Sequence, residues 1–369
     1  MQKHPVEFIV NQSHLPESKF APLSLPDAQQ LPAGKVLLKV NKFAFTSNNV
    51  TYAAFGKAMK YWNFFPTETG WGNIPVWGFA DVIASGVDGV NVGERFYGYF
   101  PMASHVLVTP VRVSAAGFTD GAEHRQEMHG LYNQYLRSSA DPAYTADSED
   151  AQVLLRPLFI TSFMIDDFID DNQLFGATTV IISSASSKTA YGLAFLLSLR
   201  KDRQYRIVGL TSAGNLEFVR GLGIYDQVLG YDEVETLAAD QAVVYVDMAG
   251  NGTLRSKLHH HFQDNMKYSC AVGGTHWEEL SGAGDLPGAR PTLFFAPAQI
   301  KKRATDWGPG GVQARLATAW HQFMQPLILS GQPWMRVIHG TGPDAVQAVY
   351  QSMLKGGAAP DEGHVLSLS

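Results

Sequence analysis

The chain has 369 residues, of which 45% are hydrophobic and 17% charged, and its formal net charge is -6. This composition is typical of a globular protein with a sizeable core, and the length favours two domains over one. No run of Lys and Arg is long enough for a nucleic-acid footprint, no apolar run could span a bilayer, and the first residues lack the apolar core of a signal peptide. The single cysteine, Cys270, excludes an intramolecular disulfide and a multi-cysteine metal site. We therefore expect a cytoplasmic protein that binds neither nucleic acid nor membrane.

Residues before Ser114 predict a β-rich domain. The clearest strand pattern is KVLLKVNKFAF at residues 35–45, and DVIASG, ERFYGYF and HVLVTP add short strands between turns that contain Gly and Pro. Many short strands separated by such turns favour a barrel-like domain. Residues 117–150 break this pattern because they are polar and rich in Tyr without a strand period, and DPAYTADSED (141–150) predicts an exposed loop.

The central part of the chain predicts a different architecture. After a helical segment at residues 159–171, the stretch VIISSASSKTAYGLAFLL (180–197) passes from a β-branched run through a polar turn into an apolar helix. Further strands and helices alternate at residues 206–210, 215–221, 227–229 and 242–250. Alternating strands and helices predict a parallel, doubly wound sheet. The turn after the first strand of such a sheet faces a ligand, and the next helix offers free N–H groups to an anion, which favours nucleotide binding.

After Pro297 the pattern changes again. VQARLATAWHQFMQPLILSG has helical spacing, PWMRVIHG predicts a strand, and AVQAVYQSML predicts an amphipathic helix between an N-cap at Asp344 and Gly356. HVLSL predicts a last short strand.

This order of segments resembles the medium-chain dehydrogenase/reductase superfamily over nearly the whole chain. The resemblance rests on IPVWGFADVIASGVDGVNVGERFYGY, GLTSAGNLEFVRGLGIYDQVLGY, VVYVDMAGN and the ending from PWMRVIHG to HVLSL. It implies an α/β protein with a GroES-like β-rich barrel domain (1–165 and 298–369, with an insertion at 117–155) and a Rossmann-type doubly wound parallel sheet domain (166–297). Relatives often dimerise through the nucleotide-binding sheet, so a homodimer is a further expectation.

The zinc-free branch, with its quinone oxidoreductases and enoyl reductases, looks most similar. Zinc-dependent members carry an early Cys ligand and a His-Glu pair after a Gly, whereas Gly78 is followed here by Phe79 and Ala80. The His259–His261 run lies in a helical segment of the nucleotide-binding half, where we expect an exposed polar helix end. Zinc needs converging His, Cys or carboxylate ligands, so we predict no metal site.

Serines stand in the turn where the family has glycines. Glycines there permit positive φ and close approach of the pyrophosphate. Hydroxyls and a lysine at a helix N-terminus can instead bind phosphate, which makes Ser184, Ser186, Ser187, Lys188 and Thr189 the predicted cofactor contacts. The alternative is a hydrophilic connection in a fold that has lost its cofactor.

The end of the second strand bears on the choice of nucleotide. NAD-preferring sites place Asp or Glu there for the ribose 2′-OH, but this chain has Thr211 and Ser212. We therefore predict NADP(H), although no Arg follows and the two residues also suit a simple turn.

The resemblance also implies contacts on the substrate side. It makes Asn49 and Tyr52 catalytic candidates, with Tyr52 as proton donor or as a packed aromatic residue. Cofactor contacts are expected at Ser162, Gly250, Gly273, Gly274 and Phe295. The insertion is expected to act either as a pocket lid that supplies Tyr132, Asn133 or Tyr135 or as a surface decoration.

The absence of zinc ligands favours an activated substrate. Hydride addition to a simple ketone builds a basic alkoxide, which zinc or a strong donor normally stabilises. Addition to a quinone, enone or enoyl group spreads the charge, so weaker donors suffice. We expect a zinc-independent NADPH-dependent reductase of such substrates. The alternatives are an NADPH-dependent carbonyl reductase that uses Tyr52 as acid and a non-catalytic nucleotide sensor.

Overall fold

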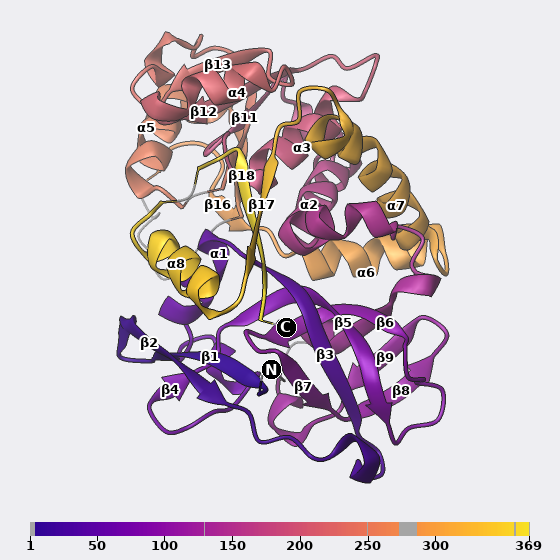
Figure 1. Ribbon diagram of the computed structural model, residues 1–369. Coiled ribbons are helices and arrows are strands. Elements are labelled where there is room, and N and C mark those ends of the chain that lie inside the picture. Colours follow the sequence, from indigo (N-terminus) through magenta and orange to yellow (C-terminus); the bar gives the residue numbers. More distant parts are fainter. Residues whose placement is uncertain (1–3, 129, 249, 273–285, 358, 369) are drawn as a thin grey trace. The chain divides into compact units, whose positions relative to one another are not determined.

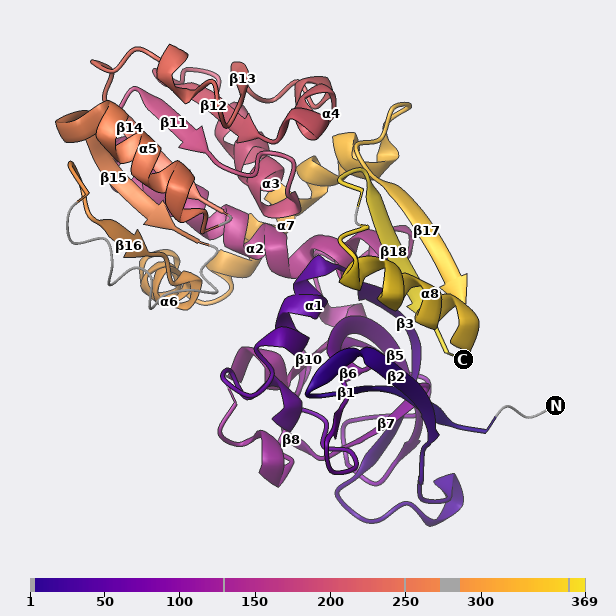
Figure 2. The same cartoon turned by 90° about the vertical axis from the view of Figure 1, so that its left-hand side faces the viewer.

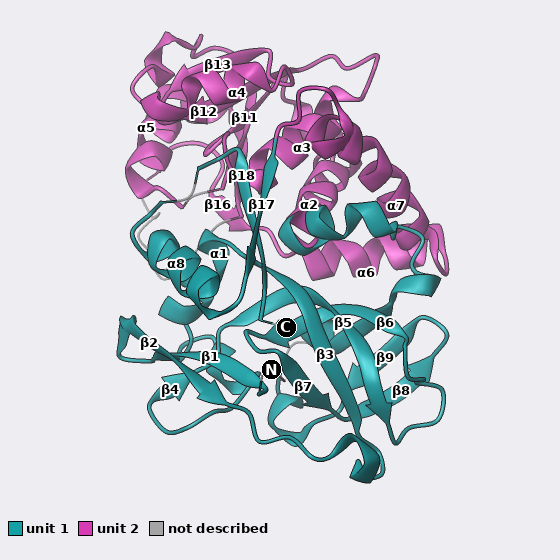
Figure 3. Cartoon of the chain, viewed as in Figure 1, with its two compact units in different colours: residues 1–154, 335–369 teal, residues 155–334 magenta. Residues whose placement is uncertain are grey.

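The computed structural model describes residues 4–128, 130–248, 250–272, 286–357 and 359–368. The chain divides into two compact units, which Figure 3 colours separately. Unit 1 comprises Met1–Leu154 and Met335–Ser369, and unit 2 comprises Leu155–Trp334.

These bounds differ from the predicted domain limits, because residues 155–165 and 298–334 cluster with the parallel sheet. The reason is a helix, α2 (Glu149–Asp171), that runs through the expected boundary, and a pair of helices, α6 (Ala296–Trp307) and α7 (Gly311–Met324), that pack on it. The ring of Phe159 stacks on Phe323 at 4.7 Å between centroids, and the Arg303 guanidinium pairs with the Asp167 carboxylate at 2.7 Å.

Unit 1 is built on antiparallel strands (Figure 1). Its larger, nine-stranded sheet has the order β17-β18-β3-β5-β6-β10-β9-β8, with β7 also paired to β3. Over the described residues, β17 and β18 form its only parallel pair. A small sheet has the order β2-β1-β4. The strands are β1 (Val6–Asn11), β2 (His14–Pro22), β3 (Val36–Phe45), β4 (Trp71–Gly72), β5 (Pro75–Ser85), β6 (Arg95–Pro101), β7 (His105–Val108), β8 (Pro110–Ser114), β9 (Gly117–Asp120), β10 (Gln134–Arg137), β17 (Arg336–Thr341) and β18 (Glu362–Ser367).

Two helices cover the core of unit 1. They are α1 (Ser47–Ala54) and α8 (Pro343–Leu354). The ring of Tyr350 in α8 meets Phe8 and Phe45 edge-on, at 5.1 and 5.7 Å between centroids. Most of the buried residues on the sheet are apolar or aromatic, so the core forms as the strand pattern of the sequence predicts.

The insertion contains two strands that its polar, Tyr-rich sequence did not predict. β9 pairs with β8, and β10 pairs with both β9 and β6, so both segments extend the large sheet. Gly117 has φ 141°, and a Cβ there would lie 2.0 Å from the Tyr135 carbonyl oxygen, so this register accepts only glycine. Strands of four residues are too short to show a clear alternation of apolar and polar residues, which is why the sequence did not predict them.

Unit 2 contains the predicted doubly wound sheet, with six parallel strands in the order β13-β12-β11-β14-β15-β16. The chain leaves the centre in opposite directions from β11 and β14, which makes the crevice between their carboxyl ends the switch point of the sheet. The strands are β11 (Thr179–Ile182), β12 (Arg206–Thr211), β13 (Gln227–Gly230), β14 (Val243–Asp247), β15 (Met266–Ala271) and β16 (Pro291–Leu293).

Side chains that alternate along the strands bury both faces of this sheet. Val180 and Ile182 of β11 pack with α2 and α3 (Lys188–Ser198), whereas Ile181 packs with α5 (Gly252–Phe262). Figure 2 shows these helices on opposite sides of the strands. A short helix, α4 (Leu216–Gly221), follows β12. Burial on both faces explains the near-continuous β-branched runs in these strands.

The connection from α2 to β11 has unusual backbone geometry. Gln173, Leu174, Phe175 and Gly176 all have positive φ, between 51° and 75°, so they form a left-handed turn. For a residue with a Cβ this conformation costs roughly 1–2 kcal/mol. Packing holds the turn in place, since the Phe175 ring stacks on Tyr268 with 4.1 Å between centroids.

Replacing the exposed Gln173 with glycine should raise the free energy of unfolding by about 0.5–1 kcal/mol, because relief of the left-handed strain outweighs the extra freedom of glycine in the unfolded chain. Gln173→Ala keeps the Cβ and should leave stability nearly unchanged. Urea denaturation of both variants provides the measurement. A glycine variant that is less stable than the alanine variant would contradict the left-handed geometry.

Candidate functional site

The serine turn links β11 to α3 in unit 2. Ser184 lies in the left-handed region with φ 48°, and its carbonyl accepts from the Ser187 N–H at 2.7 Å. Ser187 caps α3, with its Oγ accepting from the Ala190 N–H at 3.4 Å. Lys188 and Thr189 occupy the first positions of the helix, where the dipole favours anions. The turn therefore takes a glycine-type conformation without glycine.

Polar side chains from the ends of three strands gather beside this turn. The Ser186 Oγ accepts from the Asn215 Nδ2 at 3.0 Å and lies 3.5 Å from the Thr211 Oγ1, while Ser184 and Tyr231 bring their hydroxyls within 3.3 Å. Ser212 is exposed next to the buried Thr211. The sequence prediction missed Asn215 and Tyr231, although the position of Tyr231 just after β13 was a usable signal.

Two carboxylates follow Tyr231. The Glu233 Oε2 accepts from the Gly230 N–H at 2.7 Å, so one of its oxygens serves the turn after β13. Asp232 is exposed and also lies close to Gly230. Both would repel a phosphate group near Tyr231. The hydroxyl-rich ends of β11 and β12 are therefore better suited to an anion than the end of β13.

The switch point also holds a buried carboxylate, Asp247 at the end of β14. Its Oδ1 accepts from the Ser183 Oγ at 3.1 Å and from the Gly250 N–H at 3.0 Å, and its Oδ2 lies 3.8 Å from the Arg255 Nε. Gly250 has φ 68°. Because the Gly250 N–H already donates to Asp247, Gly250 helps to form the turn after β14 in this structure. Its contact with a cofactor stays a prediction.

Ser162 lies between two helices. It is fully buried, and its Oγ is 2.8 Å from the Thr189 carbonyl oxygen and 3.1 Å from that of Leu158. A Cβ at Gly192 would lie 2.9 Å from this Oγ. The structure therefore gives Ser162 a role in packing α2 against α3, and its contact with a cofactor stays a prediction. Phe295 precedes α6 and is 58% exposed, while Gly273 and Gly274 lie outside the described residues.

In unit 1, Tyr52 of α1 lies among four other aromatic side chains. We call the set the tyrosine cluster: Tyr52, Tyr61, Trp77, Tyr99 and Tyr132. Ring centroids are 4.5 Å apart for Tyr52 and Tyr61, 4.9 Å for Trp77 and Tyr99, and 4.9 Å for Tyr99 and Tyr132. These spacings are typical of edge-to-face and offset packing.

The hydroxyl of Tyr52 has a defined electrostatic environment. It accepts a hydrogen bond from the Asn48 Nδ2 at 2.8 Å. Burial raises the pKa of Tyr52 well above its usual value, which the nearby Tyr132 reinforces. Tyr52 is therefore a neutral phenol at physiological pH and can donate a proton.

Asn49, the predicted catalytic asparagine, is a helix cap. Its Oδ1 accepts from the Thr46 N–H at 2.8 Å, and its Nδ2 donates to the Pro75 carbonyl at 2.9 Å. The side chain is 4% exposed and closes the capping box of α1. Asn48, one position earlier, is the asparagine whose amide contacts Tyr52, and a catalytic role for Asn49 stays a prediction.

Asn133 and Tyr135 of the insertion serve a buried arginine. Arg125 is completely buried and donates from Nε to the Asn133 Oδ1 at 3.0 Å and from Nη1 to the Tyr135 hydroxyl at 3.0 Å. Both polar side chains therefore support the fold, and the expectation that Tyr132, Asn133 or Tyr135 contacts substrate stays a prediction.

Comparison with known families places the chain in a group defined by sequence. Residues 43–359 match the family described as "Protein of unknown function (DUF2855)". The chain belongs to the DUF2855 family. No curated protein matches this DUF2855 chain.

Solved structures show what its fold resembles. CurA in complex with NADPH from Vibrio vulnificus has 11% identity and a TM-score of 0.63, and covers 99% of both chains. The quinone oxidoreductase from Coxiella burnetii has 13% identity and a TM-score of 0.58, with 100% of both chains covered. The mitochondrial 2-enoyl thioester reductase Etr1p/Etr2p heterodimer from Candida tropicalis has 12% identity and a TM-score of 0.57, with 99% of this chain and 100% of the other covered. At such identities these matches show the fold alone, and they confirm the predicted combination of a GroES-like β-rich part and a Rossmann-type parallel sheet.

The histidine run of this DUF2855 protein is engaged within the fold. His259 is fully buried, not exposed as expected, with its ring nitrogens 2.8 Å from the Pro287 carbonyl and 3.0 Å from the Ser269 Oγ. His260 and His261 bond the backbone carbonyls of Ser256 and Leu237. Over the described ranges, no group of three His, Cys, Asp or Glu could hold a metal ion. Within the same ranges, no helix is both long and apolar enough to cross a membrane.

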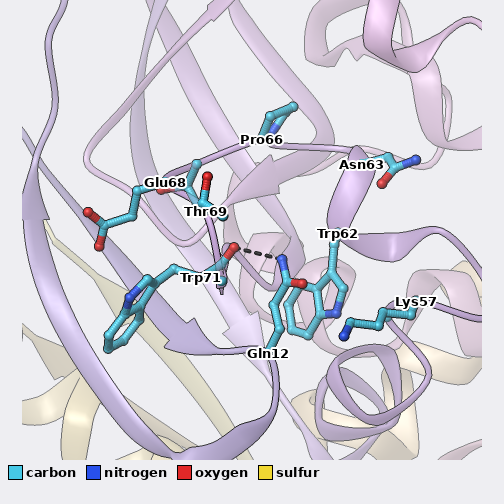
Figure 4. Close-up of a pocket in the computed structure, with 11 residues that line it drawn as sticks. Gln12, Lys57, Trp62, Asn63, Pro66, Glu68, Thr69 and Trp71 are labelled. Carbon is cyan, nitrogen blue, oxygen red and sulfur yellow. Dashed lines mark hydrogen bonds between the residues drawn. The ribbon is translucent and has the colours of Figure 1, made fainter.

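A hollow of about 330 Å³ opens elsewhere in unit 1 (Figure 4). Trp62 fits against it because Gly56 and Gly72 leave room: a Cβ at either would lie within 2.3 Å of the indole. Gln12 donates to the Trp71 carbonyl at 2.7 Å. None of the predicted site residues lines this hollow, so it carries no functional assignment.

Proposed function

We propose that this DUF2855 protein is a zinc-independent, NADPH-dependent oxidoreductase that reduces a quinone, an enone or an enoyl-type double bond. The observation that carries the proposal is the state of Tyr52, a buried neutral phenol held by Asn48 among aromatic rings. The fold supports it, since proteins of similar structure include a quinone oxidoreductase and an enoyl thioester reductase. In this proposal unit 2 binds the cofactor and unit 1 binds the substrate.

NADPH fits the residues around the serine turn. The left-handed backbone at Ser184 turns the chain as a glycine would, and a Cβ at Gly209 would lie 3.0 Å from the Ala185 Cβ, so the strand must stay small there. When bound, NADPH supplies a hydride, so that a quinone, NADPH and a proton become a hydroquinone and NADP⁺. The residues assigned to hold the cofactor are Ser184, Ser186, Ser187, Lys188, Thr189, Thr211, Ser212 and Asn215.

The donors of unit 1 suit a substrate whose charge is delocalised. A phenol is a weak acid, and burial makes Tyr52 weaker still. It could protonate a hydroquinone oxygen, whose own pKa is near that of a phenol, more readily than it could neutralise a localised alkoxide. This match favours quinones and enones over simple ketones.

NADPH should bind more tightly than NADH, and Lys188→Ala should weaken NADPH binding by about 1–3 kcal/mol if its ammonium contacts a phosphate. Lys201→Ala, an exposed lysine beyond the C-terminus of α3, is the matched control and should leave affinity unchanged. Fluorescence titration of both nucleotides provides the test. Equal affinities for NADH and NADPH would remove the assignment of Thr211 and Ser212.

The proposed activity is tested by following loss of NADPH absorbance with a panel of quinones, enones, enoyl thioesters and simple ketones. We expect turnover with at least one activated substrate, and the same rate after treatment with a chelator. Turnover confined to simple ketones would indicate a carbonyl reductase. NADPH binding without turnover on any electrophile would indicate a sensor.

A further inference from the structure

Two polar atoms in the tyrosine cluster lack partners. Over the described part of the chain, neither the Tyr99 hydroxyl nor the Trp77 indole Nε1 makes a hydrogen bond, although both atoms are buried. Leaving a buried donor unpaired costs stability. Neighbouring Tyr135 shows the usual arrangement, since its hydroxyl accepts from Arg125 and donates to the Tyr99 carbonyl. The two free donors are therefore a local exception that needs a reason.

Sheet register places these two donors side by side. Trp77 of β5 stands opposite Tyr99 of β6, so both side chains point to the same face. That face is also the one covered by Tyr52, whose ring centroid lies 6.1 Å from that of Tyr99. Both groups approach the Tyr52 hydroxyl closely enough to offset part of the rise in its pKa that burial causes.

The arrangement contains more donors than acceptors. The Asn48 amide donates to the Tyr52 oxygen, so the proton of Tyr52 must point toward another group. Three donors thus lie in the tyrosine cluster: the Tyr52 and Tyr99 hydroxyls and the Trp77 N–H.

We propose that Tyr99 and Trp77, together with Tyr52, bind a carbonyl oxygen of a planar aromatic substrate, which makes a quinone the preferred substrate class. The proposal rests on the reductase function proposed above and narrows it. Three donors match an oxygen that gains negative charge during reduction. The side chains around these donors, Tyr61 and Tyr132 among them, are aromatic, which suits a planar quinone ring better than an aliphatic enoyl chain.

The test uses binding without the cofactor. The probe is 4-nitrophenol, whose phenolate is coloured and carries an oxygen like that of a reduced quinone. Tyr99→Phe and Trp77→Phe should each weaken its binding about 10-fold to 100-fold, the loss expected for a hydrogen bond to a charged oxygen. Tyr350→Phe is the matched control, because it removes another buried hydroxyl of unit 1, bonded to the Leu15 carbonyl, and should leave affinity unchanged.

Stability gives a second readout. Because the Tyr99 hydroxyl has no partner, Tyr99→Phe should melt at the same or a higher temperature, whereas Tyr350→Phe should melt lower. Unchanged 4-nitrophenol affinity in both Tyr99→Phe and Trp77→Phe would overturn the inference, even if quinones are reduced. Weakened binding in these variants supports the donor site even if no substrate is turned over. The experiment can therefore contradict the donor site and the reductase function independently of each other.

Discussion

Replacing Arg125 with methionine should lower the free energy of unfolding by about 3–5 kcal/mol, the range measured when one partner of a buried ion pair is removed. Arg125 has no exposed surface and pairs with the Asp120 carboxylate at 2.9 Å, which is itself 4% exposed. The variant leaves that charge buried without its counterion. Urea denaturation measures the loss, with Arg220→Met, an exposed arginine of unit 2, as a control expected to change stability by less than about 0.5 kcal/mol.

The size of this effect comes from the number of groups that Arg125 serves. Its guanidinium also donates to Asn133, to the Tyr135 hydroxyl and to the Tyr132 carbonyl. It lies over the rings of Phe64 and Phe65 at 5.4 and 5.1 Å. The contacts with Asn133, Tyr135 and Tyr132 hold the insertion together, and those with Phe64 and Phe65 attach it to the rest of unit 1, so the loss should exceed that of a typical ion pair.

A double variant separates charge from packing. Adding Asp120→Asn to Arg125→Met removes the buried negative charge, so it should recover part of the lost stability. If the double variant is as unstable as the sum of the two single variants, the ion pair contributes nothing specific and the aromatic contacts of the arginine dominate.

The parallel sheet could be predicted from sequence because its signal is local. Strands such as β11 and β14 are buried on both faces, so they read as uninterrupted β-branched runs. The insertion gave no such signal. Its strands have four residues each, and a single arginine, Arg125, satisfies the polar side chains that made the segment look like a loop.

The site was harder to predict than the fold. Asn48 and Asn49 are adjacent, but consecutive helical residues point about 100° apart, so one meets Tyr52 and the other caps the helix. No local pattern tells the two apart. Trp77 and Tyr99 were missed for a different reason, because only the register of β5 and β6 brings them together.

Tyr52→Phe should lower kcat by about 10²–10⁴-fold, the usual contribution of general acid catalysis, while leaving NADPH affinity nearly unchanged. The phenol would donate only as charge develops on the substrate oxygen, so its loss is a transition-state effect. Folding should survive, because the change removes the hydrogen bond from Asn48 but the ring keeps its contact with Tyr61. Tyr61→Phe is the control, since it removes a hydroxyl from the same cluster but keeps the proposed acid.

The pH profile adds a check that a purely structural role would not pass. An acid must be protonated to act, and burial raises the pKa of Tyr52 far above its usual value. Activity that depends on Tyr52 should therefore persist past pH 10, where an exposed tyrosine would already have ionised. A rate that falls near the pKa of an ordinary phenol would mean that the acid is a solvent-exposed group. An unchanged kcat in Tyr52→Phe would instead pass the role to Tyr132, the remaining hydroxyl candidate from the insertion, because the amide of Asn49 is held by its cap.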